Sequence, residues 1–213
     1  MQTEQALFDA IASDLRNTGY STRAQALSPD LSSRLRQEAQ KAQASRTLKA
    51  AGIGRNTGYT SNADIRRDEI AWIEGETETQ KQWLDWCSQL QLHMNRQLML
   101  GLFSFESHYA HYAPGAFYKK HVDAFKGQAN RMLSVVAYLN PDWNTENGGE
   151  LVIYSEHQAD QEVFRVSPEE GTVVVFLSEE FPHEVLPAKV DRYSIAGWYR
   201  LNTSTGQRVD PPT

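Results

Sequence analysis

The sequence predicts an α+β fold in which helices precede a β-sandwich or a jelly-roll barrel. Apolar residues recur at helical spacing in the first half of the chain, whereas from Phe103 onward the apolar period changes to two. Short strand-like runs separated by turn signals follow, a spacing typical of sandwiches and jelly rolls. We expect the helices gathered before these strands to brace one face of a sheet.

Three helices are expected before the strands. The first has an apolar face and ends at Gly19, which supplies a stop signal. The second begins with Ser28 as its N-cap and Pro29 at its first helical position. The third covers roughly 79–100, and Cys87 lies in its apolar stripe. We therefore interpret this cysteine as an inert core residue.

The expected organisation is one structural domain with three parts. Region 1–101 is helical and packs on the core, and it includes a mobile loop and a strand at 52–73. Region 102–201 forms the core, and 202–213 is a flexible tail. The strand candidates are 103–112, 117–123, 131–139, 150–154, 162–166, 172–176 and 193–200.

The composition is that of an ordinary soluble globular protein. The chain has 213 residues, of which 40% are hydrophobic and 23% charged, and its net charge is −6 without a clustered Lys/Arg stripe. These features argue against a nucleic-acid footprint, and no apolar run is long enough to suggest a membrane span. The N-terminus does not resemble a secretory signal, and a single cysteine fits a reducing compartment. We therefore expect a cytoplasmic protein.

Two metal-binding side chains, His121 and Asp123, lie two positions apart in a strand candidate. Alternate residues of a strand share a face, so an imidazole and a carboxylate can point to one place, although a solvated strand end would show the same pattern. His183, after a hydrophobic strand and a turn, is the best third ligand. Two His and one carboxylate are the ligands of non-haem Fe(II) oxygenases. His108 and His111 are three apart and face opposite sides, so we interpret them as structural.

An arginine follows nine residues after the last of these candidates. Arg192 begins a strand that is otherwise apolar or aromatic, so it needs an anionic partner if it points inward. Its planar guanidinium group can bind a carboxylate through two charge-assisted hydrogen bonds. Ser194 points to the same face and is a candidate second donor. Taken alone, such an arginine is more often a surface ion-pair partner.

The ordered set of motifs resembles a known family. The chain contains "IRRDEIAWIEG", "YAPGAFYKKHVD", "YLNPDW", "GGELVI", "FPHEVLPA" and "RYSIAGWY", with the His-x-Asp, His and Arg residues in order. This order is similar to that of the Fe(II)- and 2-oxoglutarate-dependent dioxygenases. More narrowly, it resembles the oxygen-sensing (hypoxia-factor) prolyl hydroxylases and their bacterial relatives. The resemblance covers roughly residues 50–200 and implies a double-stranded β-helix, a cupin-like jelly roll.

The resemblance implies a role for each motif residue. His121, Asp123 and His183 would bind iron. Arg192 would pair with the distal carboxylate of 2-oxoglutarate, helped by the hydroxyl of Tyr138.

Further residues would surround the cosubstrate. Tyr112 would lie beside it, and Leu151 and Trp198 would line the pocket near the reacting centre. Ser194 departs from the animal oxygen sensors, which carry a small apolar residue there, so a contact with the cosubstrate stays open. The resemblance also suggests that Asp68 pairs with Arg131 and thereby positions the loop 52–69 over the site.

The implied activity is hydroxylation of a prolyl residue in a protein substrate. The cofactors would be Fe(II), 2-oxoglutarate and O2, with release of succinate and CO2 and with ascorbate as a supporting reductant. We expect a monomer that binds neither nucleic acid nor membranes. Two alternatives stay open: the same cofactors acting on another side chain or a small molecule, and a non-catalytic cupin-like metal-binding sensor. The substrate's identity and the oxygen affinity do not follow from the sequence.

Overall fold

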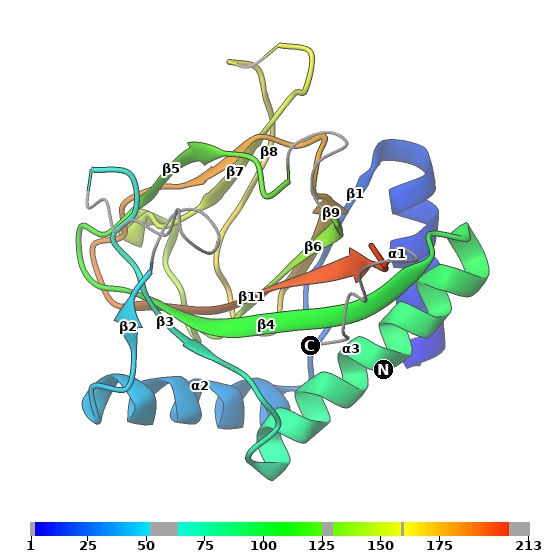
Figure 1. Cartoon of the computed structure of the whole chain (residues 1–213). Coiled ribbons are helices and arrows are strands. Elements are labelled where there is room, and N and C mark those ends of the chain that lie inside the picture. Colours follow the sequence, from blue (N-terminus) through cyan, green and yellow to red (C-terminus); the bar gives the residue numbers. More distant parts are fainter. Residues whose placement is uncertain (1–2, 52–63, 125–129, 159, 205–213) are drawn as a thin grey trace.

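Two antiparallel sheets that face each other form the centre of the protein (Figure 1). The computed structural model describes residues 3–51, 64–124, 130–158 and 160–204. Within these residues the larger sheet has the strand order β1-β9-β6-β11-β4-β3-β2, and the smaller one has the order β5-β10-β7-β8. The predicted α+β fold with a double-stranded β-helix core and N-terminal supporting helices is confirmed.

The three helices precede most of the strands, as expected, but β1, β2 and β3 lie between the helices along the chain. The helices are α1 (Glu4–Thr18), α2 (Pro29–Ala44) and α3 (Glu78–Leu98), with a short 3-10 helix, η2 (Thr145–Asn147). The strands are β1 (Tyr20–Arg23), β2 (Lys49–Ala50), β3 (Glu69–Trp72), β4 (Leu102–Tyr112), β5 (Tyr118–His121), β6 (Arg131–Tyr138), β7 (Leu151–Tyr154), β8 (Glu162–Val166), β9 (Val173–Leu177), β10 (His183–Val185) and β11 (Arg192–Leu201).

The helix ends are set by the residues that the sequence indicated. The Ser28 hydroxyl accepts a hydrogen bond from the N–H of Leu31 at 3.2 Å, and Pro29 occupies the first turn. Gly19 ends α1 with a φ of +79°, and its N–H donates to the carbonyl of Leu15 at 3.0 Å. A left-handed residue there is least strained as glycine. Both predictions are confirmed.

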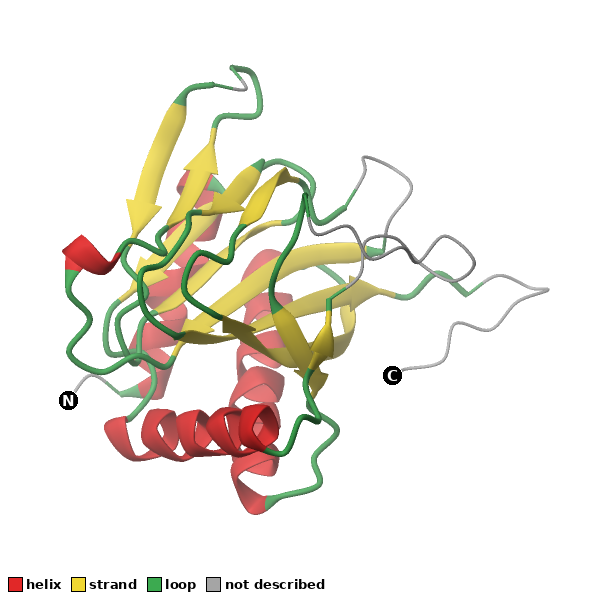
Figure 2. Ribbon diagram, turned by 90° about the vertical axis from the view of Figure 1, so that its left-hand side faces the viewer, coloured by secondary structure: helices red, strands yellow, loops and turns green. Residues whose placement is uncertain are grey.

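The three helices cover the outer face of the large sheet, whereas the small sheet lies on its other side (Figures 1 and 2). In β11 the odd-numbered residues, such as Tyr193 and Tyr199, pack with the helices in the main apolar core. Cys87 of α3 is fully buried in this core, and burial raises the pKa of its thiol well above the ordinary value. The interpretation of Cys87 as a core residue is confirmed.

A second buried cluster fills the space between the two sheets. It contains Ala110, Tyr112, Tyr138, Val174 and Phe176 from the large sheet and Leu151, Ile153, Val166 and Val185 from the small sheet. Even-numbered residues of β11 share this inner face because side chains alternate along a strand. The inner face therefore holds Arg192, Ser194 and Trp198, three of the residues expected at the site.

Some elements differ from the sequence-based expectation. The strand expected over 117–123 ends at His121, and Asp123 lies in a bend beyond it. Strands β1 and β10 were not predicted, because each is only three or four residues long and lies beside a turn. Most of the expected mobile loop (52–63) and of the expected tail (205–213) lies outside the described residues. None of the described helices is both long and apolar enough to cross a membrane.

Candidate active site

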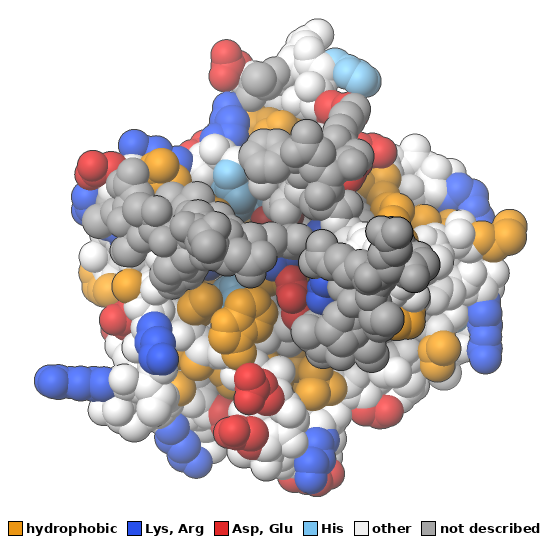
Figure 3. Space-filling view, viewed as in Figure 1, with side chains coloured by type: hydrophobic (Ala, Val, Ile, Leu, Met, Phe, Trp, Pro, Cys, Tyr) orange, Lys and Arg blue, Asp and Glu red, His pale blue; other side chains and the backbone are white. Residues whose placement is uncertain are grey.

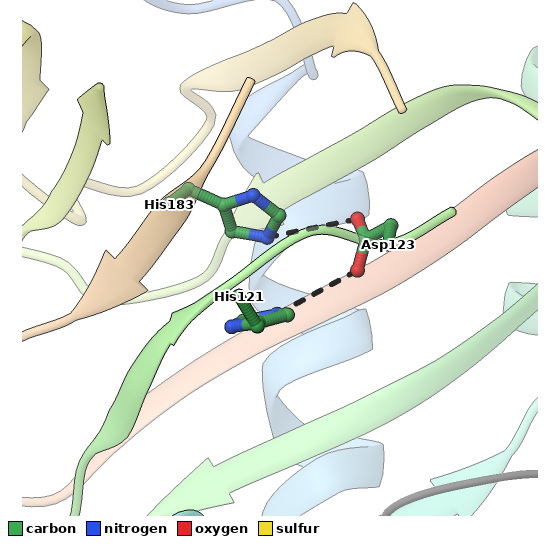
Figure 4. A group of neighbouring side chains, drawn as sticks. All are labelled: His121, Asp123 and His183. Atoms are coloured by element: carbon green, nitrogen blue, oxygen red, sulfur yellow. Dashed lines mark ion pairs between the residues drawn. The ribbon is translucent and has the colours of Figure 1, made fainter. Parts of the chain in front are cut away.

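Three side chains converge between the sheets at the ends of short strands (Figure 4). His121 is the last residue of β5, and it pairs in register with His183, the first residue of β10. Asp123 follows His121 by two residues and turns back toward both rings. Its two carboxylate oxygens lie 3.6 Å from the Nε2 atoms of His121 and His183. The ligand atoms of all three lie within 4.8 Å of one another, which is close enough to hold one ion.

Backbone hydrogen bonds orient both imidazoles. The Nδ1 atom of His121 lies 2.8 Å from the carbonyl of Lys119, and Nδ1 of His183 lies 2.9 Å from the carbonyl of Phe181. Because a carbonyl only accepts, each Nδ1 carries the proton and donates, which leaves the lone pair on Nε2. The two Nε2 atoms face Asp123, so the tautomers suit metal binding.

A serine hydroxyl of the large sheet holds the carboxylate of Asp123 in place. The hydroxyl of Ser134 in β6 donates to its Oδ2 at 2.6 Å, and the hydroxyl of Ser178 lies 2.9 Å from that of Ser134. Burial by itself would raise the pKa of Asp123, but the two imidazoles and this hydroxyl hold it well below its ordinary value. Burial, and then the neighbouring His121 ring, lowers the pKa of His183 to about 4. The trio therefore offers an ionised carboxylate and a neutral His183 at neutral pH, the forms that bind metal.

A buried cation lies on the same inner face. The side chain of Arg192 is only 1% exposed; its Nε donates to the carbonyl of Gly149 at 2.8 Å and one Nη donates to the hydroxyl of Ser194 at 3.1 Å. Its guanidinium lies 4.8 Å and 5.2 Å from the ring centres of Tyr112 and Tyr138. In the described part of the chain it forms no ion pair. A buried guanidinium without a carboxylate is costly, so this place is suited to an anionic ligand.

The hydroxyl of Tyr138 supports the same conclusion. It is buried and has no hydrogen-bond partner among the described residues. Burial raises the pKa of Tyr138 to about 12, so the hydroxyl stays protonated and can donate. A buried polar group without a partner is rare unless a ligand satisfies it.

The donor set fits Fe(II) and 2-oxoglutarate. Two imidazole nitrogens and one carboxylate would hold the iron and leave coordination positions for a chelating ligand. Arg192 and Tyr138 together offer hydrogen-bond donors for one carboxylate of 2-oxoglutarate.

Comparisons with known proteins agree with this geometry. Residues 107–200 match the model of the 2OG-Fe(II) oxygenase superfamily. A solved structure of a Pseudomonas putida prolyl-4-hydroxylase is 41% identical, with a TM-score of 0.83, and the match covers 91% of this chain and 99% of that one. This chain belongs to the 2OG-Fe(II) oxygenase superfamily. Within it, the chain groups with the prolyl hydroxylases.

Two further relatives are similar to this chain. The Trichoplax adhaerens prolyl hydroxylase, solved with a hypoxia inducible factor oxygen degradation domain peptide, is 27% identical with a TM-score of 0.83; the match covers 93% of this chain and 91% of that chain. Human Egl nine homolog 1 is 33% identical over an alignment of 149 residues, and the match covers 65% of this chain. The chain spans only 34% of the length of that human relative.

Other residues expected around the cosubstrate are buried on the inner faces of the two sheets. Tyr112 and Leu151 belong to the buried cluster between the sheets. Ser194 is buried and bonded to Arg192, and is thereby placed beside the anion site. Trp198 is buried on the same face of β11, but its indole N–H has no hydrogen-bond partner in the described residues. Their contacts with a cosubstrate stay predictions.

The expected ion pair between Asp68 and Arg131 is wrong. Asp68 binds Arg66 through two hydrogen bonds of 2.5 and 2.8 Å. Arg131 instead donates to Glu106 at 2.5 and 3.0 Å and lies 3.7 Å from the ring centre of Trp198. Each charge has a nearer partner: Arg66 is two residues from Asp68, and Glu106 on β4 lies across β11 from Arg131.

Three other histidines are buried and have partners in the fold, and two of them, His108 and His111, were expected to be structural. His108 and His111 face opposite sides of β4: His108 packs beside Trp198 on the inner face, and His111 stacks on Tyr193 on the helix side. His93 of α3, for which the sequence indicated no partner, lies 3.0 Å from the carboxylate of Asp9.

Sequence reasoning missed several residues that support the site. Ser134 is a polar residue in the apolar run of β6, and this break in the pattern was a usable signal. Tyr118 stacks on His121, with ring centres 3.6 Å apart. Gly149, whose carbonyl accepts from Arg192, has a φ of +74°, and an added Cβ would lie 3.1 Å from the Arg192 side chain. The last two contacts depend on long-range geometry that spacing does not reveal.

Proposed function

We propose that this protein is an Fe(II)- and 2-oxoglutarate-dependent hydroxylase of prolyl residues in a protein substrate. The observation that carries the proposal is the convergence of His121, Asp123 and His183, together with the buried Arg192 on the inner face, which has no carboxylate partner in the described part of the chain. Bound together, Fe(II) and 2-oxoglutarate supply the activation of O2 that adds one oxygen atom to the substrate and releases succinate and CO2.

The protein's own residues position the reactants and exclude water. His121, Asp123 and His183 hold the metal, while Arg192 and the protonated Tyr138 hydroxyl bind and orient the distal carboxylate of 2-oxoglutarate. The aromatic and aliphatic cluster between the sheets keeps water away from this carboxylate, which strengthens its pairing with Arg192.

Similarity to prolyl hydroxylases supports the choice of a prolyl substrate. The match to the Pseudomonas putida prolyl-4-hydroxylase extends over nearly all of that chain. The Trichoplax adhaerens enzyme was solved with a peptide of its protein substrate, which supports a protein partner here. Lys and Arg side chains are interspersed with acidic ones on the face shown in Figure 3, and this agrees with a partner other than nucleic acid.

The first test is an anaerobic titration of the metal-free protein with Fe(II) and then with 2-oxoglutarate. We expect a visible charge-transfer absorption band in the wild type and in Asp160→Ala, whose carboxylate is fully exposed. The band should be lost in Asp123→Ala and weakened in Arg192→Ala. A folded wild-type protein that binds Fe(II) but gives no band would refute the 2-oxoglutarate site.

The second test identifies the reaction. Candidate proteins are incubated with the enzyme, Fe(II), 2-oxoglutarate and O2; succinate is measured and peptides are mapped by mass spectrometry. One added oxygen on proline, absent with Asp123→Ala, is the expected result. Substrate-dependent succinate with oxygen on another residue would refute the prolyl assignment and keep the cofactors.

Three finer properties belong to the same proposal. We place the enzyme in the cytoplasm, which its single cysteine supports. Ascorbate would support turnover by keeping iron reduced, and it should raise the number of turnovers without changing the product. A monomer is expected, and light scattering of the metal-loaded protein checks this.

A further inference from the structure

A column of three stacked side chains leads from Arg66, in the segment before β3, to the metal ligand His121. The ring of Tyr118 lies on the imidazole of His121, with the centres 3.6 Å apart and the planes within 17°. The guanidinium of Arg66 lies 4.5 Å from the centre of the Tyr118 ring. This cation–π contact and the aromatic stack hold Tyr118 between a cation and the ligand.

The outer end of the column is fixed. Arg66 is bound by both carboxylate oxygens of Asp68, which is 2% exposed. The backbone N–H of Arg67 donates to Phe117 at 3.0 Å, and that of Lys119 donates to Ile65 at 2.9 Å. The segment before β3 and the start of β5 are thus paired by their backbones as well as by the column.

His121 needs such support because its strand gives it little. Strand β5 has four residues, lies at the edge of the small sheet and pairs with β10 at a register shift. The bond from Nδ1 of His121 to Lys119 comes from the same strand, two residues away. A planar neighbour at 3.6 Å restricts rotation of the imidazole further than this one local hydrogen bond does.

We propose that Tyr118, anchored by the Arg66–Asp68 pair, is a positioning residue that sets the ring plane of His121 for metal binding. The proposal rests on the metal site of the proposed function. Outer contacts that orient a ligand are commonly needed for full metal affinity, and their loss weakens binding by about 10- to 100-fold.

The test is the affinity of the metal-free protein for Co(II), measured by calorimetry and by the visible d–d absorption of the bound ion. We expect Tyr118→Leu to bind Co(II) about tenfold more weakly, with an altered spectrum. Tyr118→Phe keeps the stack and should bind within about twofold of the wild type, with the same spectrum. The control is Tyr154→Leu, a half-buried tyrosine of β7 on the same sheet whose ring packs on Lys120, and this variant should bind Co(II) like the wild type.

Each outcome bears on a different step. Wild-type affinity and spectrum in Tyr118→Leu would overturn the positioning role, as would a Tyr118→Phe variant as weak as Tyr118→Leu. If Tyr118→Leu does not fold, Tyr118→Met provides the same comparison with an unbranched side chain. A folded wild-type protein that binds no Co(II) would instead overturn the metal site and thus the proposed function itself.

Discussion

Replacing Arg192 by Met should leave the unliganded protein almost as stable as the wild type. Breaking a buried ion pair costs about 3–5 kcal/mol, but this guanidinium forms no ion pair in the described part of the chain. The substitution removes an unpaired buried cation and also two hydrogen bonds, to Gly149 and Ser194, worth about 1 kcal/mol each. These effects oppose each other, so the free energy of unfolding should change by no more than about 1 kcal/mol.

The same substitution should nearly abolish the stabilisation of the folded protein by 2-oxoglutarate. Losing a bidentate, charge-assisted contact of about 2.7 kcal/mol weakens binding about 100-fold. With the metal site loaded and 2-oxoglutarate at about 100 times the wild-type Kd, the ligand stabilises the wild type by about 2.7 kcal/mol. The Arg192→Met variant would gain only about 0.4 kcal/mol under the same conditions.

Urea denaturation with Mn(II), with and without 2-oxoglutarate, measures both quantities. Arg23→Met is the control, because Arg23 of β1 pairs with Asp14 of α1 at the edge of the large sheet, and its loss should leave the stabilisation by 2-oxoglutarate unchanged. A loss of more than about 3 kcal/mol without ligand would show that Arg192 is already paired with a carboxylate. A full ligand response in Arg192→Met would refute the assignment of the anion site.

Three other substitutions test the surroundings of the site. Ser134→Ala should weaken Mn(II) binding about tenfold in calorimetry, because Asp123 loses its hydroxyl donor; unchanged affinity would contradict this. Gly149→Ala should lower 2-oxoglutarate affinity, since its Cβ meets the Arg192 side chain and its φ is positive; wild-type affinity would show that the turn adapts. Burial and then Arg66 lower the pKa of His108 to about 4, so stability should fall by about 3 kcal/mol as the pH falls from 6.5 to 4. His108→Gln should remove that part of the pH dependence in urea denaturation, and an unchanged slope would refute it.

The sign of the pH effect follows from where the proton binds. An unfolded histidine has a pKa near 6.5, whereas buried His108 is protonated only near pH 4. Between these values the unfolded chain binds more protons than the folded protein. The stabilisation is therefore complete above about pH 6.5 and is lost as the pH falls toward 4.

The fold was predictable because its signals are local. Caps such as Ser28 and the left-handed Gly19 fix helix ends within a few residues, and a period of two marks the long strands. Strand β10 has only three residues, too few for a period, and it was missed. Its pairing with β5 and β7 comes from the closure of the small sheet rather than from its own sequence.

The site was predictable only where residue type and spacing limit the chemistry. The sequence predicted that His121 and Asp123 lie on one strand and point to one place. The two side chains do converge, but the strand ends at His121 and the chain then bends, so the predicted cause of the convergence was incomplete. The ion pair expected between Asp68 and Arg131 failed for a related reason. Which of several nearby charges a carboxylate meets depends on sheet register, and register is not visible in the spacing of one motif.

The two halves of the site differ in how firmly the fold holds them. Arg192 begins β11, a ten-residue strand that pairs with both β4 and β6 in the middle of the large sheet. The metal ligands lie on a four-residue edge strand, in the bend after it and on a three-residue strand. The backbone therefore preforms the anion site, whereas the metal site depends on side-chain contacts from Ser134 and Tyr118. Substitutions of such supporting residues should thus affect metal affinity more readily than affinity for the distal carboxylate.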